Sequence, residues 1–299
     1  MDLSAELAQP GTEGSPLAIT YSLLDGNYPE NRTDDMIMQE LFVMRFFLDG
    51  EWLYRTAPDQ WSPAPAAALW GSASTMEKLR CPAPFRIFSI GLRTVAWLEL
   101  AGSPPGDFVD RVTPIDPFFG GAVPQFLDAL RSAGDLQEMA TIADAWLAGL
   151  RRGKIRPQTA DRARIFEEYA HYDWERPIGE IAEEFGLSTR QLERMTTQSI
   201  GFKPKLLTRR HRFLNVATAL RGLGDTEWQE LCYRYYADQS HMSREFRKFA
   251  GMAPGEFKEA HAPLLDATLR FRDASYRFLK SPEGRNRLSG DLPSFQQAI

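Results

Sequence analysis

The spacing of apolar residues divides the chain into a part with short strands and a part made of helices. Apolar runs of strand length lie at residues 17–23, 36–54, 67–70 and 85–90. Asp49-Gly50 splits the second run, and an Asp-Gly pair between two such runs predicts a β-hairpin. The rest of residues 1–35 and residues 56–66 are rich in turn-forming residues and are expected to be loops.

Helical spacing begins after Gly91, in segments near residues 95–100, 123–132 and 136–151. The last of these segments places Met139, Ala143 and Leu147 on one face. Such a face packs on the core of its own domain or forms a seam between two copies of the chain. The pattern favours the first interpretation and leaves a homodimer open.

A polar break at residues 151–157 marks the expected domain boundary, because the pattern beyond it is helical to about residue 280. Strands followed by a long helical run are typical of an α+β chain with two domains of different class. We therefore expect a β-rich sensor or dimerisation domain at 1–155 and an all-α domain at 156–262. Residues 263–299 are expected to form a C-terminal helical extension and a loose tail.

The helical part repeats itself at an interval of fifty residues. The matched pairs are Ile181 and Leu231, Leu192 and Met242, Arg194 and Arg244, Gly201 and Gly251, and Pro204 and Pro254. A repeat of this length is a supersecondary unit, and two copies form a pair of modules rather than a solenoid.

Each unit has the pattern of a helix-turn-helix motif. In the first, a short amphipathic helix ends near Gly186, and Ser188 starts a second helix with the sequence of a capping box. The outward positions of that second helix are polar and cationic, as a helix that reads the major groove requires. In the second unit Thr226 begins another capping-box sequence, and Asp238 is expected to cap the following helix.

Charge supports a nucleic-acid partner only when it is counted by segment. The whole chain has a net charge of −5, but residues 186–258 contain 13 basic and 7 acidic residues. Residues 1–160 are acidic, with 13 basic and 20 acidic residues. A basic stretch attached to an acidic domain fits double-stranded DNA as partner.

The same inventory argues against several other classes of protein. The chain has two cysteines, and none of its four histidines precedes His171, so no thiolate zinc site or local histidine base is expected in the first part. No apolar run has the length of a membrane span, and the first twenty residues lack the basic segment of a secretory signal. We expect a cytoplasmic protein with no catalytic residues, no metal and no cofactor.

The helical part resembles the DNA-binding domain of the AraC/XylS family of bacterial transcription regulators. The residues that carry the resemblance are EIAEEFGLSTRQLER at 180–194, GFKP at 201–204, Arg212-Phe213, and DQSHMSREFRKFAGMAPGEF at 238–257. The resemblance implies seven helices with two helix-turn-helix motifs, whose recognition helices would lie near 188–199 and 239–249. It also implies association with the bacterial nucleoid through DNA.

The resemblance and the helical pattern together give the candidate site residues. The implied base readers are Arg190, Glu193, Arg194, Gln239, Ser240 and Arg244. The candidate phosphate contacts are Lys203, Lys205, Arg209, Arg210, Arg212, Arg247 and Lys248. Arg can bond two acceptors of guanine and Gln can pair with adenine, whereas Glu193 could accept from cytosine or orient a neighbouring arginine.

The first domain resembles, more loosely, the cupin-like β-rich domain of some regulators of this family, through residues 85–116. This resemblance implies a small-molecule effector, with RNA polymerase as a further partner. Two alternatives stay open. One is an enzyme whose pocket is lined by the N-terminal aromatic residues. The other is a ligand-binding or interaction protein with degenerate DNA binding, which the departures from the family pattern at Thr196 and Tyr235 would favour.

Overall fold

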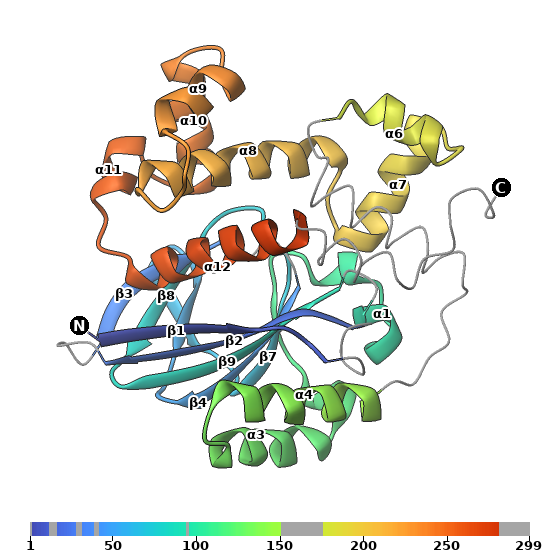
Figure 1. Cartoon of the computed structure of the whole chain (residues 1–299), viewed down its shortest axis with the longest axis vertical. Coiled ribbons are helices and arrows are strands. Elements are labelled where there is room, and N and C mark those ends of the chain that lie inside the picture. The colour runs from blue at the N-terminus through green and yellow to red at the C-terminus, as the bar shows by residue number, and fades with distance from the viewer. Residues whose placement is uncertain are drawn as a thin grey trace.

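A computed structural model describes residues 2–11, 17–27, 32–38, 42–93, 96–150 and 176–280 of the chain. Within these ranges the strands all precede residue 115, and the chain after it is helical (Figure 1). The predicted α+β class, with a β-rich N-terminal region and a helical C-terminal region, is confirmed. The predicted boundary at 151–157 lies outside the described residues.

The strands form two antiparallel sheets. The larger sheet has the order β1 (Asp2–Ala8), β2 (Ala18–Asn27), β9 (Phe85–Leu92), β4 (Val43–Asp49), β7 (Ala67–Trp70) and β10 (Val112–Pro114). The smaller sheet has the order β3 (Arg32–Ile37), β8 (Glu77–Pro82), β5 (Leu53–Ala57) and β6 (Gln60–Pro63). Buried aromatic side chains fill the space between the sheets, among them Phe47, Trp52, Trp70 and Phe85.

Three sequence predictions for this region are wrong. The Asp49-Gly50 turn does not join a hairpin, because β4 pairs with β7 and β9 whereas β5 pairs with β6 and β8. Gly50 takes a left-handed φ of 83° and leads the chain from the larger sheet into the smaller one. In addition, β1 and β3 lie in the expected N-terminal loop, and β6 lies within the expected loop at 56–66.

Helices cover the outer face of the larger sheet. They are α1 (Ala96–Ala101), the 3-10 turn η1 (Pro105–Phe108), α2 (Asp116–Phe119), α3 (Ala122–Ser132) and α4 (Leu136–Leu150). Met139, Ala143 and Leu147 of α4 are fully buried in the same cluster as the sheet residues Met44 and Phe46. The apolar face of α4 therefore packs within its own domain, and it is not available as a seam between two copies.

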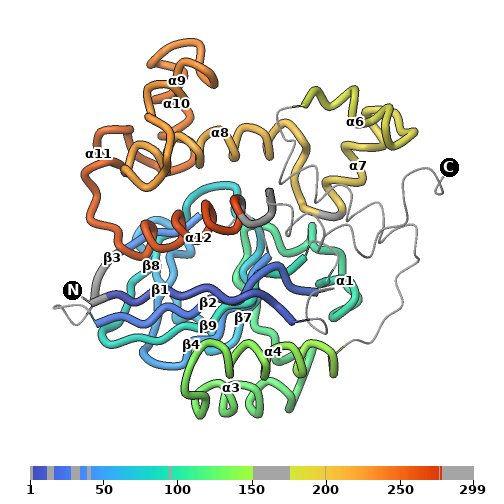
Figure 2. The backbone as a smooth tube through the Cα atoms, in the orientation of Figure 1, coloured from blue at the N-terminus to red at the C-terminus, as the bar shows by residue number. Residues whose placement is uncertain are grey.

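The C-terminal helices are α6 (Ile178–Glu184), α7 (Thr189–Ile200), α8 (Pro204–Leu220), α9 (Trp228–Tyr235), α10 (Gln239–Phe249), α11 (Pro254–Glu259) and α12 (Pro263–Lys280). Figure 2 shows that the long α8 connects the pair α6–α7 to the pair α9–α10. The first of the seven helices that the resemblance implies would fall on residues outside the described part of the chain.

Candidate DNA-binding surface

The first helical pair has its own small core and a well-formed helix start. Ile181, Leu192 and Phe202 are buried together, so α7 is held against α6 and the start of α8. Gly186 takes a left-handed φ of 61° in the turn. Ser188 accepts a hydrogen bond from the backbone N–H of Gln191, and the Gln191 side chain accepts from the backbone N–H of Ser188 at 2.8 Å. The predicted turn and capping box are confirmed.

The second pair is built by different local means. Asp238 caps α10 by accepting from the backbone N–H of His241 at 2.6 Å, as predicted. The capping box predicted at Thr226 is wrong, since α9 begins after Glu227 without a side-chain cap. Tyr235 ends α9 and Tyr236 is extended, with φ −122°, so this turn is made without the left-handed glycine of the first motif.

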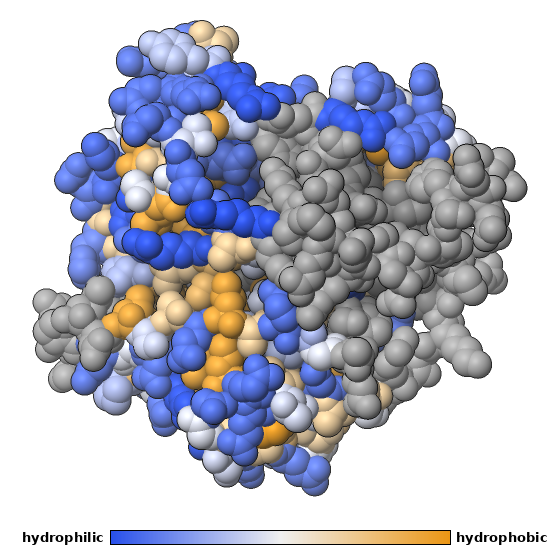
Figure 3. Space-filling view, in the orientation of Figure 1, coloured by the Kyte–Doolittle hydropathy of each residue, from blue (hydrophilic) through white to orange (hydrophobic). Residues whose placement is uncertain are grey.

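The two recognition helices present the predicted base readers to solvent. Arg190 and Arg194 are exposed on α7, while Leu192 behind them is fully buried. Gln239, Ser240 and Arg244 are exposed on α10. Glu193 is half-buried, and its carboxylate lies 4.0 Å from the ammonium of Lys203. Figure 3 shows hydrophilic side chains over both helical pairs, α6–α7 and α9–α10.

The predicted phosphate contacts divide into an exposed group and an enclosed group. Lys203, Lys205, Arg247 and Lys248 are exposed at the two motifs, and Arg212 is half-buried with its guanidinium 6.0 Å from the ring of Tyr235. Exposed lysines and arginines at these positions are suited to contact a phosphate backbone.

The guanidinium groups of Arg209 and Arg210 both contact other side chains of the protein, and their contact with phosphates stays a prediction. Arg209 donates from Nε and Nη2 to the buried carboxylate of Glu245 on α10, at 3.1 and 2.5 Å, and this ion pair raises the pKa of Arg209. Arg210 is 1% exposed, with its guanidinium 4.8 Å from the ring of Phe202. Arg209 ties α8 to α10, and Arg210 packs on Phe202, which lies just before α8.

Two exposed residues of α9 were missed by the sequence reasoning. Tyr233 is 90% exposed, and the neighbouring Arg234 is also exposed. Both fall on the outward face of an amphipathic helix that precedes a recognition helix, where side chains contact the DNA backbone in this class of motif. The signal was the helical spacing of Trp228, Leu231 and Cys232, which places positions 233 and 234 off the buried face.

The N-terminal aromatic residues are core rather than pocket lining. Phe42, Phe46, Phe47, Trp52 and Trp70 are at most 6% exposed. Trp61 is half-buried beneath the guanidinium of Arg80, at 4.0 Å. Within the described part of the chain, no group of three or more His, Cys, Asp or Glu residues could hold a metal ion.

Buried charge lies beside this aromatic core. The guanidinium of Arg45 is 5.4 Å from the ring of Trp70, and burial lowers the pKa of Arg45 to about 10. Burial also raises the pKa of Glu77 to about 8, although the charge of Arg45 opposes that rise. A cleft of about 350 Å³ opens elsewhere, on the outer side of β1 and β2, where Glu6, Asp25, Arg86 and Asp135 contribute to its lining. Its lining carries both acidic and basic side chains, and it lies apart from the recognition helices.

Residues 181–260 match the family described as a helix-turn-helix domain, HTH_18. No curated protein matches the chain in sequence. Among the helices that the structure describes, none has both the length and the apolar character needed to cross a membrane.

Solved structures give weaker matches. A point variant of apo ToxT from Vibrio cholerae aligns at 10% identity over 84% of this chain and 98% of that chain, with a TM-score of 0.42. Wild-type ToxT bound to an unsaturated fatty acid aligns at 12% identity over 80% and 94% of the two chains, with a TM-score of 0.42. The AraC-like transcriptional activator CuxR aligns at 11% identity over 71% and 86%, with a TM-score of 0.30. The family match at residues 181–260 falls on the helices from α6 to α11.

Proposed function

We propose that the chain is a DNA-binding transcription regulator of the AraC type. Its helix-turn-helix domain at residues 181–260 would read DNA sequence with both recognition helices. The observation that carries this proposal is the exposure of Arg194 on α7 and Arg244 on α10, at equivalent positions of the two units. Each arginine stands opposite a fully or nearly fully buried apolar residue, Leu192 or Met242, so its helix has one face for the core and one for a groove.

Two recognition helices in one chain would read successive major-groove segments about one helical turn (~34 Å) apart. In this proposal Arg190, Arg194 and Arg244 bond guanine edges, while Gln239 and Ser240 bond adenine or either base. Glu193 accepts from a cytosine amino group or orients a neighbouring arginine of α7. Lys203, Lys205, Arg247 and Lys248 neutralise phosphates, and Arg234 adds a contact from α9.

The N-terminal domain would sense a small-molecule effector, and contact with RNA polymerase would follow DNA binding. Support for a sensing role comes from its contacts with both motifs. Gly106 of η1 lies so close to α7 that a Cβ there would meet the carbonyl oxygen of Thr197 at 2.7 Å. The backbone N–H of Met76 donates to the carbonyl of Phe249, at the end of α10, at 2.7 Å. A homodimer, if formed, would use a surface other than the apolar face of α4. Localisation to the cytoplasm and the nucleoid is part of the same proposal.

The test uses the duplex that the wild-type protein enriches from a random pool. Arg194→Ala and Arg244→Ala should each lose about 1–3 kcal/mol of specific binding, and each should relax base preference in a different element of the site. Arg55→Ala, which removes an exposed arginine of β5, is the matched control and should bind like wild type. Alanine variants of Lys205 or Lys248 should weaken binding to all sequences. Each should also lower the slope of log binding constant against log salt concentration by about one. If both reader variants keep wild-type affinity and preference, the assignment of the readers is wrong.

A further inference from the structure

The C-terminal extension α12 has two apolar faces that belong to two different cores. Leu264 and Ala267 are buried between the sheets of the N-terminal domain, in the cluster that contains Trp52 and Trp70. Leu265 and Leu269 are buried instead in the core of the second helix-turn-helix unit. That core contains Phe213 of α8, Phe246 and Phe249 of α10, and Phe257 of α11. In Figure 2, α12 lies between α8 and the strands β3 and β8.

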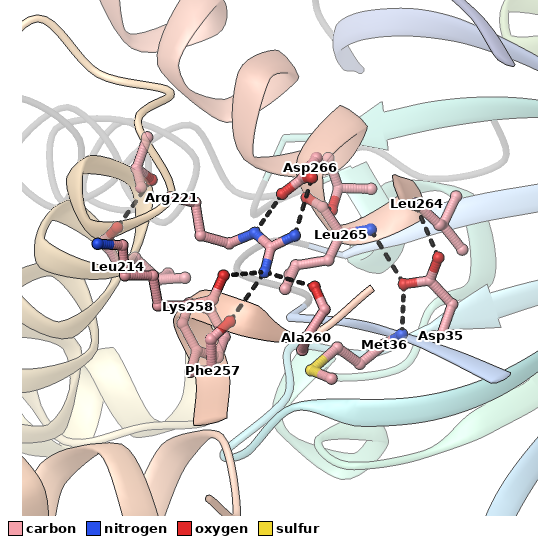
Figure 4. Close-up of polar contacts among 12 residues, drawn as sticks. Asp35, Met36, Leu214, Arg221, Phe257, Lys258, Ala260, Leu264, Leu265 and Asp266 are labelled. Atoms are coloured by element: carbon pink, nitrogen blue, oxygen red, sulfur yellow. Dashed lines mark hydrogen bonds and ion pairs between the residues drawn. The ribbon is translucent and has the colours of Figure 1, made fainter. Parts of the chain in front are cut away.

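Asp35 of β3 fixes the start of α12 on the N-terminal domain. One of its carboxylate oxygens accepts from the backbone N–H of Leu264 at 2.7 Å, and the other from Leu265 at 3.2 Å and Met36 at 2.7 Å (Figure 4). The first helical N–H groups have no partner inside their own helix, so this carboxylate caps α12 from a strand far away in sequence. Asp35 is 4% exposed; its burial raises its pKa to about 6, while the three N–H groups oppose that rise.

Arg221, directly after α8, fixes the other side of α12 to the second unit. Its guanidinium forms a two-pronged ion pair with Asp266 of α12, in which Nη2 donates to Oδ2 at 2.9 Å (Figure 4). Its Nη1 donates to the carbonyl oxygens of Phe257 at 2.8 Å and Ala260 at 2.9 Å, at the end of α11. One arginine therefore ties α8, α11 and α12 together.

The N-terminal domain also enters the second unit directly. Met36, the residue after Asp35, is buried in the same cluster as Phe213 and Phe249. The first unit contacts another part of the N-terminal domain, since a Cβ on Gly201 would lie 1.9 Å from Cγ2 of Val109. The two motifs are thus held by separate segments of the N-terminal domain as well as by α8.

We propose that α12, capped by Asp35 and clamped by Arg221, positions the second helix-turn-helix unit for its share of DNA recognition. This inference rests on the proposed reading of DNA by both units. Asp35 and Asp266 are positioning residues, because they act on α10 through α12 and do not themselves touch DNA. Fixing α10 in advance removes an ordering cost from binding, so loosening α12 should weaken the second contact and spare the first.

The experiment measures what the second DNA element adds to affinity. The full-length protein is titrated with the enriched two-element duplex and with a duplex in which the element read by Arg244 is scrambled. The dissociation constant for the scrambled duplex is divided by that for the two-element duplex. This ratio is compared for wild type, Asp35→Asn and Asp266→Asn. In Asp35→Asn, an amide NH₂ group takes the place of one carboxylate oxygen and faces N–H donors that it cannot accept from. Asp266→Asn removes the negative charge that pairs with Arg221, at a half-buried position, and so weakens that ion pair.

Each variant has a neighbour as matched control. Asp34 is the residue before Asp35, and its exposed carboxylate pairs with Arg80 at 2.9 Å. Asp34→Asn changes this carboxylate and is the control for Asp35→Asn. Asp273→Asn changes another acid of α12, which pairs with Arg277. The controls should keep the wild-type ratio, while Asp35→Asn and Asp266→Asn should lower it about tenfold, within the usual range for coupling between sites.

Binding to the duplex with the scrambled element separates positioning from general unfolding. A variant that is merely unstable loses affinity for both duplexes equally, and that result overturns the inference. An unchanged or increased ratio in both Asp35→Asn and Asp266→Asn also overturns it. If the wild-type protein itself does not distinguish the duplexes, reading by the second unit fails, and the proposed function and this inference fall together.

Discussion

Arg209→Ala and Glu245→Gln should destabilise the helical domain by different amounts, although both break the same ion pair between α8 and α10. Glu245 has a side chain that is 6% exposed, whereas that of Arg209 is 34% exposed. Two donors of the guanidinium satisfy the two carboxylate oxygens, at 3.1 and 2.5 Å. The carboxylate is therefore the partner that cannot recover its hydration when the pair is broken.

The magnitudes follow from that asymmetry. Arg209→Ala leaves a buried charge without its counter-ion and should cost about 3 kcal/mol of unfolding free energy. Glu245→Gln keeps the shape and lets the guanidinium turn toward water, so it should cost about 1 kcal/mol. The double variant should be more stable than Arg209→Ala alone by about 1–2 kcal/mol, because it removes the stranded charge. Arg247→Ala, an exposed arginine of the same helix, should change stability by no more than about 0.5 kcal/mol.

Urea denaturation of the full-length protein at neutral pH, followed by far-ultraviolet circular dichroism, measures these differences. The expected order of stability is Arg247→Ala, then Glu245→Gln, then the double variant, with Arg209→Ala the least stable. If Glu245→Gln costs as much as Arg209→Ala, or if the two costs simply add in the double variant, then Glu245 is not held as a buried ion and the reasoning is refuted.

Three further predictions concern other parts of the chain. Glu77→Gln should gain stability relative to wild type as pH rises from about 4.5 to about 8, by about 5 kcal/mol in total, because the raised pKa of Glu77 makes the folded wild-type protein lose stability across that window. Urea midpoints at a series of pH values measure this difference, and a difference that does not change with pH would contradict it. Ser188→Ala should cost about 1 kcal/mol by removing the cap of α7, seen as faster amide exchange in its first turn; unchanged exchange would count against the cap. Gly251→Ala should lower the free energy of unfolding by about 1 kcal/mol, because Gly251 has a left-handed φ of 73°. Gly201→Ala should cost about 1–3 kcal/mol more, because its Cβ would lie 1.9 Å from Val109 Cγ2. Equal melting temperatures for the two variants would disprove that contact.

The helical domain could be predicted from sequence because its signals are local. The capping box of Ser188, the Asp238 cap and the helical spacing of Leu192, Phe246 and Phe249 all act within one or two turns. Outward positions such as Arg194 follow from the same spacing. The exposed faces of α7 and α10 therefore follow from the sequence alone.

The arrangement of the sheets could not be predicted in the same way. Asp49-Gly50 specifies a turn, but it carries no information on which strand pairs with which, so the predicted hairpin was wrong. β1 lies at the edge of its sheet, where polar residues such as Ser4 and Glu6 remain in water and hide the strand pattern.

The partners of Arg209, of Arg210 and of the predicted C-terminal helix α12 were missed because they are distant in sequence. Arg209 and Arg210 look like solvated charges until Glu245 and Phe202 are placed beside them. The cap of α12 joins Asp35 to Leu264, 229 residues apart. Asp35 was expected in a loop, and nothing in the sequence indicated that its carboxylate would cap a C-terminal helix.

The most direct test of the central claim is selection of bound duplexes from a random pool by the purified full-length protein, at a low and a moderate salt concentration. Two helix-turn-helix units that both read DNA predict an enriched site with two short elements, centred about one helical turn (~34 Å) apart, at both salt concentrations. Enrichment of a single element, or of none, would contradict the claim that α7 and α10 both read sequence.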